Sequence, residues 1–246
     1  MKIMIDQQVL EVNPGVTILE AARQHGIHIP TLCYHEAFGG QGMCRMCMVE
    51  VKTSHSRKVV AACTYPVQSG IEVQTSTPEI EKGRRTIVAL LYRNAPDSGF
   101  MQKLYTDYDC LENGLAVNNG ERCILCRLCV RACEEIGSSA ISAVLRGTEK
   151  RIGTPFDEAS AVCIGCAACA NICPTEAIAV EQTDQDRTIW NRTFTMVQCR
   201  SCGRSFATRE QLDYISQKTG LAGLDLEVCD LCRKKKLAAK IEQFAR

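Results

Sequence analysis

Two copies of one cysteine spacing constrain this chain more than any other feature. The stretches CILCRLCVRAC at 123–133 and CIGCAACANIC at 163–173 both follow C-x2-C-x2-C-x3-C. In each copy, three cysteines spaced three residues apart in a tight loop can reach three irons of one cube. The fourth lies beyond them, one helical turn on, and points toward the other cube. Two complete copies therefore predict two clusters that exchange their fourth ligands.

This run is typical of bacterial ferredoxins that carry two [4Fe–4S] clusters. We expect the first ligand set to be Cys123, Cys126, Cys129 and Cys173, and the second to be Cys133, Cys163, Cys166 and Cys169. Pro174 follows the last cysteine as the motif expects, whereas Glu134 stands where the first copy would have proline. A pair of structural zinc knuckles is the alternative, and the eight filled positions disfavour it.

A third set lies near the N-terminus, at Cys33, Cys44, Cys47 and Cys63. Its spacing, C-x10-C-x2-C-x15-C, departs from the plant-type ferredoxin spacing by a longer first loop. That loop, YHEAFGGQGM, contains glycines, whose backbone freedom lets amide N–H groups approach sulfur. Because four thiolates supply two irons with two ligands each, we expect one [2Fe–2S] cluster. A zinc site is the alternative. His35 lies in the loop, but no cysteine is missing that it would replace.

The residues around this set predict a small grasp-like α+β domain. Thr17 and Glu20 form a capping-box pattern for a helix over Ile18–His25, which Gly26 ends at its C-cap. Short strands are expected at Lys2–Asp6, Val9–Val12, Val49–Lys52, Lys58–Ala62 and Ile71–Gln74.

The middle of the chain is poor in cysteine, with Cys110 alone between Cys63 and Cys123. Pro78 stands at a favourable first helical position, and an apolar stripe at helical spacing follows it. Residues 94–120 show no strong pattern and contain the loop signal Asn113-Gly114. We therefore expect a helix followed by a loop-rich linker.

The last cysteines, Cys199, Cys202, Cys229 and Cys232, form two separated CxxC pairs after an expected strand at Thr188–Gln198. Such pairs suit a tetrahedral four-thiolate zinc site, and a third cube is the main rival. Phe206, Leu212 and Ile215 are candidates for a tiny core, which needs a metal to fold. In the terminal segment, Leu237, Ile241 and Phe244 share one helical face, which suits either a partner subunit or a solvated helix.

The order of the N-terminal set, a helical linker and the paired ferredoxin runs resembles a known family. It is similar to the N-terminal part of the large iron–sulfur subunit of respiratory complex I, and to the small diaphorase subunit of NAD-linked nickel–iron hydrogenases. Similar modules begin iron-only hydrogenases and the α subunit of NAD-dependent formate dehydrogenases. The resemblance covers residues 1–182. It implies a [2Fe–2S] cluster on a β-grasp fold, two [4Fe–4S] clusters on a ferredoxin fold, and a partner that carries flavin and binds NAD.

In the complex I family, the segment between the two modules often carries another cube, with ligands spaced H-x3-C-x2-C-x5-C. Placed after the helix expected to end near Arg93, that spacing falls on Asn94, Ser98, Met101 and Asp107. None of these is a usual ligand type. The resemblance therefore implies that residues 78–120 are a degenerate cluster region that has kept only its connecting backbone. The alternative is an ordinary linker.

The charge and hydropathy of the chain limit the classes of partner that we expect. The net charge of +1 gives no strong field that would point to nucleic acid or a membrane surface. The N-terminus does not have the pattern of a signal peptide, and no apolar run reaches transmembrane length. We therefore expect a cytoplasmic chain without a membrane span or a nucleic-acid partner. In the reducing cytosol, CxxC patterns are more often metal sites than disulfides.

We thus expect an α+β chain in four parts. These are a β-grasp [2Fe–2S] domain (1–77), a helical linker (78–120), a bacterial 2[4Fe–4S] ferredoxin-like domain (121–184) and a small four-cysteine metal module (185–246). No G-x-G-x-x-G motif follows a strand, so no dinucleotide fold and no catalytic site are expected. The predicted function is electron transfer between a flavin- and NAD(P)-binding diaphorase partner and a hydrogenase, or a formate dehydrogenase. A free ferredoxin-like carrier and an interaction protein with structural metals are the alternatives.

Overall fold

A computed structural model describes residues 1–54, 56–110, 120–221 and 226–244. The chain divides into two compact units. Unit one comprises Met1–Arg131 and Ile172–Ala177, and unit two comprises Ala132–Asn171 and Ile178–Arg246. The boundary passes once through each ferredoxin-type cysteine run. It therefore assigns the fourth cysteine of each run to the unit that holds the first three cysteines of the other.

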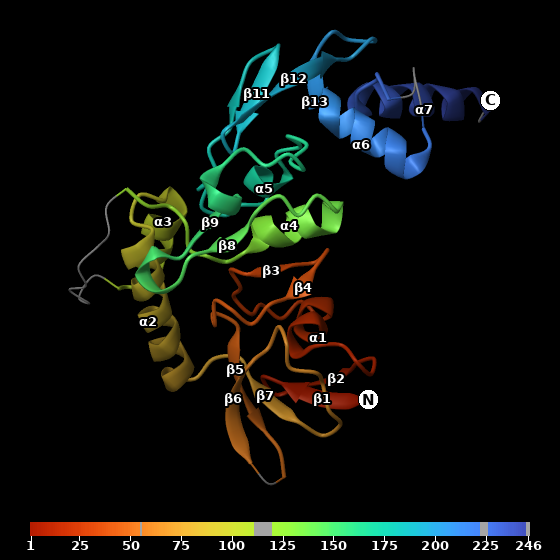
Figure 1. Cartoon of the computed structure of the whole chain (residues 1–246). Helices are drawn as coiled ribbons and strands as arrows, with labels where there is room; N and C mark the ends of the chain where they lie inside the picture. The colour runs from red at the N-terminus through yellow and green to blue at the C-terminus, as the bar shows by residue number, and fades with distance from the viewer. Residues whose placement is uncertain (55, 111–119, 222–225, 245–246) are drawn as a thin grey trace. The chain divides into compact units, whose positions relative to one another are not determined.

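Unit one is built around a mixed five-stranded sheet with the strand order β2-β1-β7-β5-β6 (Figure 1). β1 and β7 run parallel, and the other neighbours run antiparallel. Helix α1 (Ile18–Gln24) buries Ile18 and Leu19 in the same core as Val49. All five strands expected between residues 2 and 74 are present. Their bounds are β1 (Lys2–Ile5), β2 (Gln8–Glu11), β5 (Met48–Lys52), β6 (Arg57–Ala61) and β7 (Glu72–Gln74).

The capping box predicted for α1 is confirmed. The Thr17 hydroxyl accepts a hydrogen bond from the Glu20 N–H at 3.2 Å, and the Glu20 carboxylate accepts one from the Thr17 N–H at 2.7 Å. The expected C-terminal end is wrong by one residue. The helix ends at Gln24, His25 is its C-cap, and Gly26 follows with a φ of 72°. Glycine is suited to this position because the left-handed region costs it nothing.

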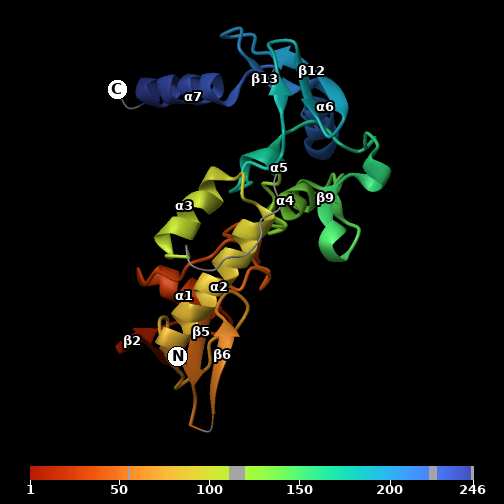
Figure 2. The ribbon, with the colours of Figure 1, turned by 90° about the vertical axis from the view of Figure 1, so that its left-hand side faces the viewer.

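Two helices follow, where the sequence predicts one helix and a loop-rich linker. Helix α2 (Pro78–Asn94) lies beside β5 (Figure 2). Helix α3 (Gly99–Asp107) corrects the prediction of a patternless linker. Met101 is its one fully buried residue, so the segment lacks the apolar stripe that would have predicted a helix. The loop signal Asn113-Gly114 lies outside the described residues.

Unit two contains two small antiparallel sheets. One pairs β8 (Ser142–Val144) with β9 (Arg151–Gly153), and the other has the order β10-β11-β12-β13. Helix α4 (Leu128–Ile136) crosses the unit boundary between Arg131 and Ala132. The remaining elements are η1 (Gly147–Glu149), η2 (Pro155–Asp157), α5 (Ala168–Asn171), β10 (Glu181–Gln182), β11 (Asp186–Ile189), β12 (Arg192–Gln198), β13 (Ser205–Thr208), α6 (Arg209–Thr219) and α7 (Asp230–Phe244).

The single strand expected at Thr188–Gln198 is wrong. Strands β11 and β12 form a hairpin there, with Ile189 opposite Arg192. Trp190 and Asn191 make the two-residue turn, with φ values of 52° and 59°. Two-residue hairpin turns with positive φ usually contain an Asn-Gly or Asp-Gly pair, which makes them recognisable in a sequence. Because a tryptophan stands at the first position here, the turn has no such signal in the sequence.

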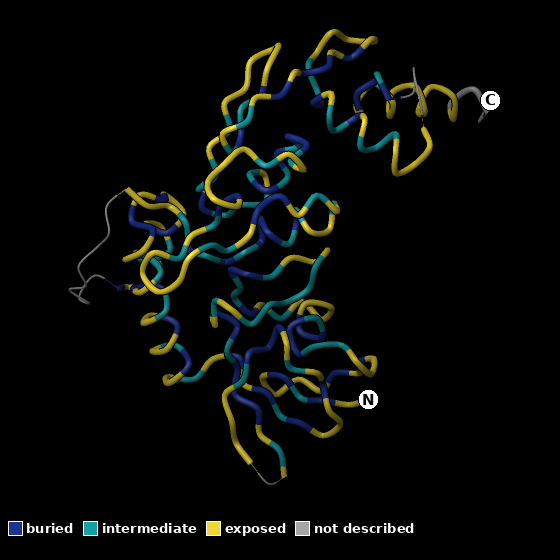
Figure 3. Tube along the Cα trace, in the orientation of Figure 1, coloured by how far each residue is buried: buried dark blue, intermediate teal, exposed yellow. Residues whose placement is uncertain are grey.

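The end of unit two has little buried apolar surface. Val197, Ala207 and Leu212 form one small cluster with Phe206 packed against it, whereas Ile215 is only half-buried. Helix α7 is largely exposed (Figure 3), and Leu237 and Ile241 are each 60% accessible to solvent. None of the helices in the described ranges has both the length and the apolarity needed to cross a bilayer.

Candidate metal centres

The fold of unit one brings the four N-terminal cysteines together in two pairs. Strand β3 (Tyr34–His35) turns back onto β4 (Gly39–Gly40), so the long loop after Cys33 returns and the Cys44 N–H donates to the Cys33 sulfur at 3.4 Å. Cys47 directly precedes β5, and Cys63 lies two residues after β6. Met48 pairs with Ala61 in the β5–β6 ladder, which places Cys47 and Cys63 side by side.

Gly40 is required by the close approach of this loop to Cys63. A Cβ at position 40 would lie 2.3 Å from the Cys63 carbonyl oxygen and 2.5 Å from the Cys63 Cβ. Contacts this short do not occur, so any other residue would push the hairpin off the site. The glycines predicted to bring the loop close to sulfur therefore include one with a measurable steric reason.

Hydrogen bonds among the thiols follow the same two pairs. A hydrogen bond with the Cys44 thiol, helped by backbone N–H groups, lowers the pKa of Cys33 to about 6. A hydrogen bond with the Cys47 thiol, helped by the Gly42 N–H, lowers the pKa of Cys63 to about 7. Three of the four cysteines are buried and Cys44 is half-buried. Two thiol pairs, each with the pKa of one member lowered, fit the two ligands per iron that a [2Fe–2S] cluster needs.

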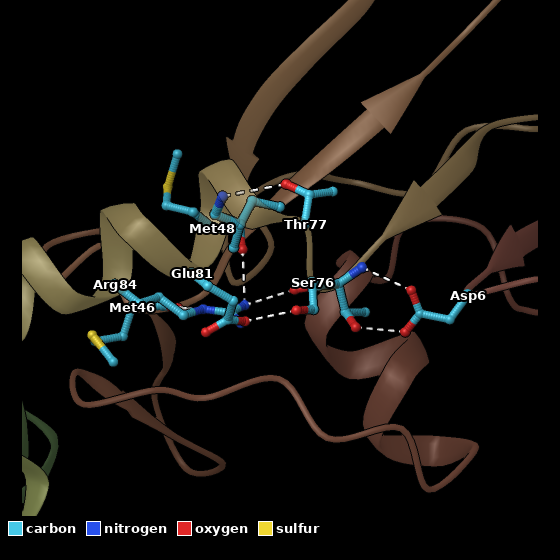
Figure 4. Close-up of polar contacts among 9 residues, drawn as sticks. Asp6, Met46, Met48, Ser76, Thr77, Glu81 and Arg84 are labelled. Atoms are coloured by element: carbon cyan, nitrogen blue, oxygen red, sulfur yellow. Dashed lines mark hydrogen bonds and ion pairs between the residues drawn. The ribbon is translucent and has the colours of Figure 1, made fainter. Parts of the chain in front are cut away.

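Arg84 anchors the middle of this ligand loop (Figure 4). Its guanidinium is buried and donates to the carbonyl oxygens of Met46 and Met48, both at 3.1 Å, and of Thr75 at 2.8 Å. Glu81, one turn before it on α2, accepts a further bond at 2.6 Å. The two methionine carbonyls flank Cys47, so α2 holds this predicted ligand in place from outside residues 1–77. The sequence gives no signal for this role, because an arginine on a helix is normally a solvated residue.

The first predicted cube set lies entirely within unit one. The N–H of Leu125 donates to the Cys123 sulfur at 3.4 Å, and the N–H of Ala177 donates to the Cys173 sulfur at 3.3 Å. Burial is the main cause that raises the pKa of Cys126 to about 11, and the charge of Cys173 adds to it. A buried thiol that is costly to ionise alone, with backbone donors aimed at its neighbours' sulfurs, fits a site that binds a positively charged metal core.

Gln41 connects the loops of these two sites. Its side-chain amide nitrogen lies 3.5 Å from the Cys33 carbonyl oxygen and 3.4 Å from the Cys126 carbonyl oxygen, and it donates to both. Cys33 and Cys126 also belong to one buried cluster with Leu32, Met46 and Leu128. The sequence gives no signal for this glutamine, because residues 41 and 126 meet only in the folded chain.

The second predicted cube set lies entirely within unit two. Cys133, Cys163, Cys166 and Cys169 line one cavity together with apolar side chains and Trp190. The N–H of Ala140 donates to the Cys133 sulfur at 3.2 Å. Gly165 has a φ of 66°, and a Cβ there would lie 2.6 Å from the Phe194 ring. An apolar cavity lined by four sulfurs fits an iron–sulfur cube, whose own size fills the space between its ligands.

The C-terminal set is arranged differently. The sulfurs of Cys199, Cys202, Cys229 and Cys232 all lie within 4.8 Å of one another, the one such group of metal-binding side chains among the described residues. The sulfurs of Cys202 and Cys229 are 3.9 Å apart. The N–H of Cys229 donates to the Cys199 sulfur, which lowers the pKa of Cys199 to about 6. Four thiols gathered this closely fit a single ion.

Cys110 lies apart from the four sets. It is fully buried after α3, and its thiol donates to the Arg85 carbonyl oxygen at 3.5 Å. Ser98 caps α3 by accepting a hydrogen bond from the Met101 N–H at 3.4 Å, and Met101 is fully buried. Two of the four positions that the family spacing would assign to a cluster thus serve an ordinary helix. That residues 78–120 descend from a cluster region stays a proposal.

Comparison with known proteins identifies the class. Residues 1–78 match the family described as a 2Fe-2S iron-sulfur cluster binding domain. The predicted [2Fe–2S] domain is therefore confirmed, in a chain of mixed α+β fold.

The relatives are more specific. The chain is 31% identical over 229 residues to a subunit of the NADH-quinone oxidoreductase of Rhizobium meliloti (strain 1021), a match that covers 82% of this chain and 26% of the relative. It is 34% identical over 177 residues to the NADH-ubiquinone oxidoreductase 75 kDa subunit of Reclinomonas americana, covering 62% of this chain and 25% of the relative. The predicted resemblance to the large iron–sulfur subunit of complex I is confirmed. The chain spans about a quarter of the length of these curated relatives.

Among solved structures, a chain of NAD+-reducing [NiFe]-hydrogenase has the same fold, with a TM-score of 0.61 at 27% identity. The match covers 72% of this chain and 85% of that one. The second predicted resemblance, to a subunit of an NAD-linked hydrogenase, is confirmed as well.

Proposed function

We propose that the chain relays electrons between a flavoprotein diaphorase that binds NAD(P)H and the catalytic subunits of a hydrogenase. A formate dehydrogenase is the second candidate for the terminal enzyme. The relatives support this proposal, because one set is NADH-linked and the structural neighbour is an NAD+-reducing hydrogenase. The observation that carries it is the Gln41 amide, which contacts the ligand loops of two sites in unit one.

Iron–sulfur clusters supply one-electron transfer when they are bound. The residues of the chain bind them, fix their spacing and exclude water. The shared buried cluster around Cys33 and Cys126 keeps the [2Fe–2S] loop and the first cube loop in contact. We propose that Cys123, Cys126, Cys129 and Cys173 hold one [4Fe–4S] cluster, and that Cys133, Cys163, Cys166 and Cys169 hold the other, on a ferredoxin-like fold at residues 121–184.

We propose zinc at the C-terminal four cysteines, in a chain that acts in the cytoplasm. A tetrahedral ion with zinc–sulfur bonds of about 2.3 Å places its ligand sulfurs about 3.8 Å apart. The distance of 3.9 Å between Cys202 and Cys229 supports this arrangement. A cube spreads its four ligands around four irons and needs wider separations.

Metal and sulfide analysis of the full chain, purified without oxygen, tests these assignments. We expect about ten irons, two from the [2Fe–2S] cluster and four from each cube, with a matching amount of acid-labile sulfide, together with one zinc. Fewer than about six irons would contradict at least one cube.

The partner is tested separately. We expect no NADH-dependent dye reduction by the pure chain, because it lacks a dinucleotide-binding motif. Activity should appear when a flavoprotein subunit co-purified with the chain is added back. Robust NADH oxidation by the pure chain would contradict the proposed role as a relay.

A further inference from the structure

The hairpin of β11 and β12 reaches the second cube site from outside the ferredoxin runs. Trp190, in the turn of the hairpin, points its indole N–H at the Cys169 sulfur, with a nitrogen–sulfur distance of 3.4 Å. Trp190 also lines the cavity that the four cysteines share.

Side chains along the hairpin hold the turn in this position. The buried Arg187 donates to the Gly165 carbonyl oxygen at 2.7 Å. Arg192 donates to the Cys163 carbonyl oxygen at 2.9 Å, and to two further carbonyls of the preceding loop. Phe194 packs against the bare Cα of Gly165. The indole is therefore positioned by several contacts to the same ligand loop.

We propose that Trp190 sets the reduction potential of the cluster bound by Cys133, Cys163, Cys166 and Cys169, through its hydrogen bond to Cys169. The inference rests on the proposed function, since it requires a cube in this cavity. Reduction adds negative charge to a cluster and its thiolates. A hydrogen bond to a ligand sulfur stabilises the reduced form more than the oxidised form, and so raises the potential.

The first cube site provides the internal contrast. Its ligand Cys173 receives a backbone N–H from Ala177 and lies 3.5 Å from the Thr175 hydroxyl. Trp190 is the only tryptophan of the chain, so the first site has no indole donor. Trp190 is therefore a positioning residue that distinguishes the second cluster from the first, although their ligand spacings are identical.

The single tryptophan allows a direct test on the unmodified full chain. Indole labelled with nitrogen-15 introduces one labelled ring nitrogen, and electron–nuclear double resonance on the reduced protein detects nitrogen-15 close to the unpaired spin. We expect a nitrogen-15 coupling from a reduced cube. A second cube that is present but shows no such coupling overturns the inference. If iron analysis shows no second cube, the proposed function fails and the inference falls with it.

Two variants separate the hydrogen bond from shielding. Trp190→Phe keeps an aromatic cover without a donor, and Trp190→Ala removes both. We expect both variants to keep about ten irons and to lower the potential of the second cube in a redox titration followed by electron paramagnetic resonance. Thr175→Val is the matched control and should leave the second cube unchanged. A shift with alanine but none with phenylalanine would show that shielding from water, and not the donor, sets the potential, and would overturn the inference.

Discussion

Unit two holds two four-cysteine sites whose side chains are the same but whose surroundings differ. At the C-terminal site the four sulfurs converge within 4.8 Å, and Cys202 is exposed to solvent. At the second cube site the cysteines line an apolar cavity, and a backbone N–H and an indole N–H point at their sulfurs. The C-terminal arrangement has room for one metal ion. At the other site, N–H donors point at sulfurs that line a cavity. Under the proposed assignments, the packing between the cysteines, more than their number, selects the metal centre.

Cysteine substitutions should have the largest effect, because each should remove the metal from one of the two sites. Cys163→Ser should lose about four irons and keep zinc, whereas Cys229→Ser should lose zinc and keep about ten irons. Because zinc binding supplies the folding free energy of such modules, about 10–16 kcal/mol in isolated zinc-finger peptides, Cys229→Ser should also leave residues after Cys199 open to proteolysis. Elemental analysis and limited proteolysis measure both results.

Cys110→Ser is the control for these substitutions. Cys110 belongs to none of the four predicted sets, and its thiol donates to a carbonyl oxygen, a bond that a serine hydroxyl can replace. We expect no loss of metal. Loss of about four irons from Cys110→Ser would place a cluster in the linker, and the same loss from Cys229→Ser would mean a third cube in place of zinc.

Two glycines distinguish the sites further. Each site contains one glycine with a left-handed backbone. Gly165 has a φ of 66° and lies against the Phe194 ring, whereas Gly203 has a φ of 73° with nothing within 4 Å of a Cβ. Alanine at either position would be strained in the left-handed region, at a cost of about 1–2 kcal/mol. Gly165→Ala also meets the ring, and overpacking adds about 1–3 kcal/mol. The midpoint of guanidinium unfolding should therefore be much lower for Gly165→Ala than for Gly203→Ala. Only Gly165→Ala should lose iron. Equal midpoints would show that the cavity yields to the extra methyl.

Much of this organisation could be predicted from local signals. The capping box at Thr17 and Glu20, the alternating strands of the N-terminal domain and the cysteine spacings all act over a few residues, and the first two are present as predicted. Helix α3 has no such local signal, because a helix with one buried residue has no apolar periodicity. The β11–β12 hairpin has none either, because a tryptophan occupies a turn position that usually takes Asn, Asp or Gly.

The groups around the cysteines could not be predicted from the sequence. Arg84 contacts Met46 across 38 residues, Gln41 contacts Cys126 across 85, and Trp190 contacts Cys169 across 21. Each contact depends on the register of a folded hairpin or helix. Arginine, glutamine and tryptophan carry no spacing rule of the kind that cysteine ligands obey. Ligand residues can therefore be proposed from a pattern, whereas the residues that position them require the fold.

A smaller effect on stability than that of Gly165→Ala is expected at Thr208. Thr208 is fully buried at the end of β13, where its hydroxyl donates to the Ile164 carbonyl oxygen at 2.5 Å and accepts from the Gln211 N–H at 3.2 Å. It therefore connects the second cube loop to the first turn of α6. Thr208→Val removes the N-cap and leaves a buried carbonyl without its donor, which should lower the free energy of unfolding by about 2 kcal/mol.

Thr208→Ser keeps the hydroxyl and loses one methyl group, about 0.8 kcal/mol of burial, so it separates the two contributions. The free energy of unfolding in urea should be highest for the wild-type chain, lower for Thr208→Ser and lowest for Thr208→Val. Iron release and zinc release should both quicken in valine, because the ligand loop and the helix share this one side chain. If valine speeds only iron release, Thr208 serves the cube loop alone and the two sites fold independently. If serine is as damaging as valine, the methyl packing of Thr208, and not its pair of hydrogen bonds, holds this junction together.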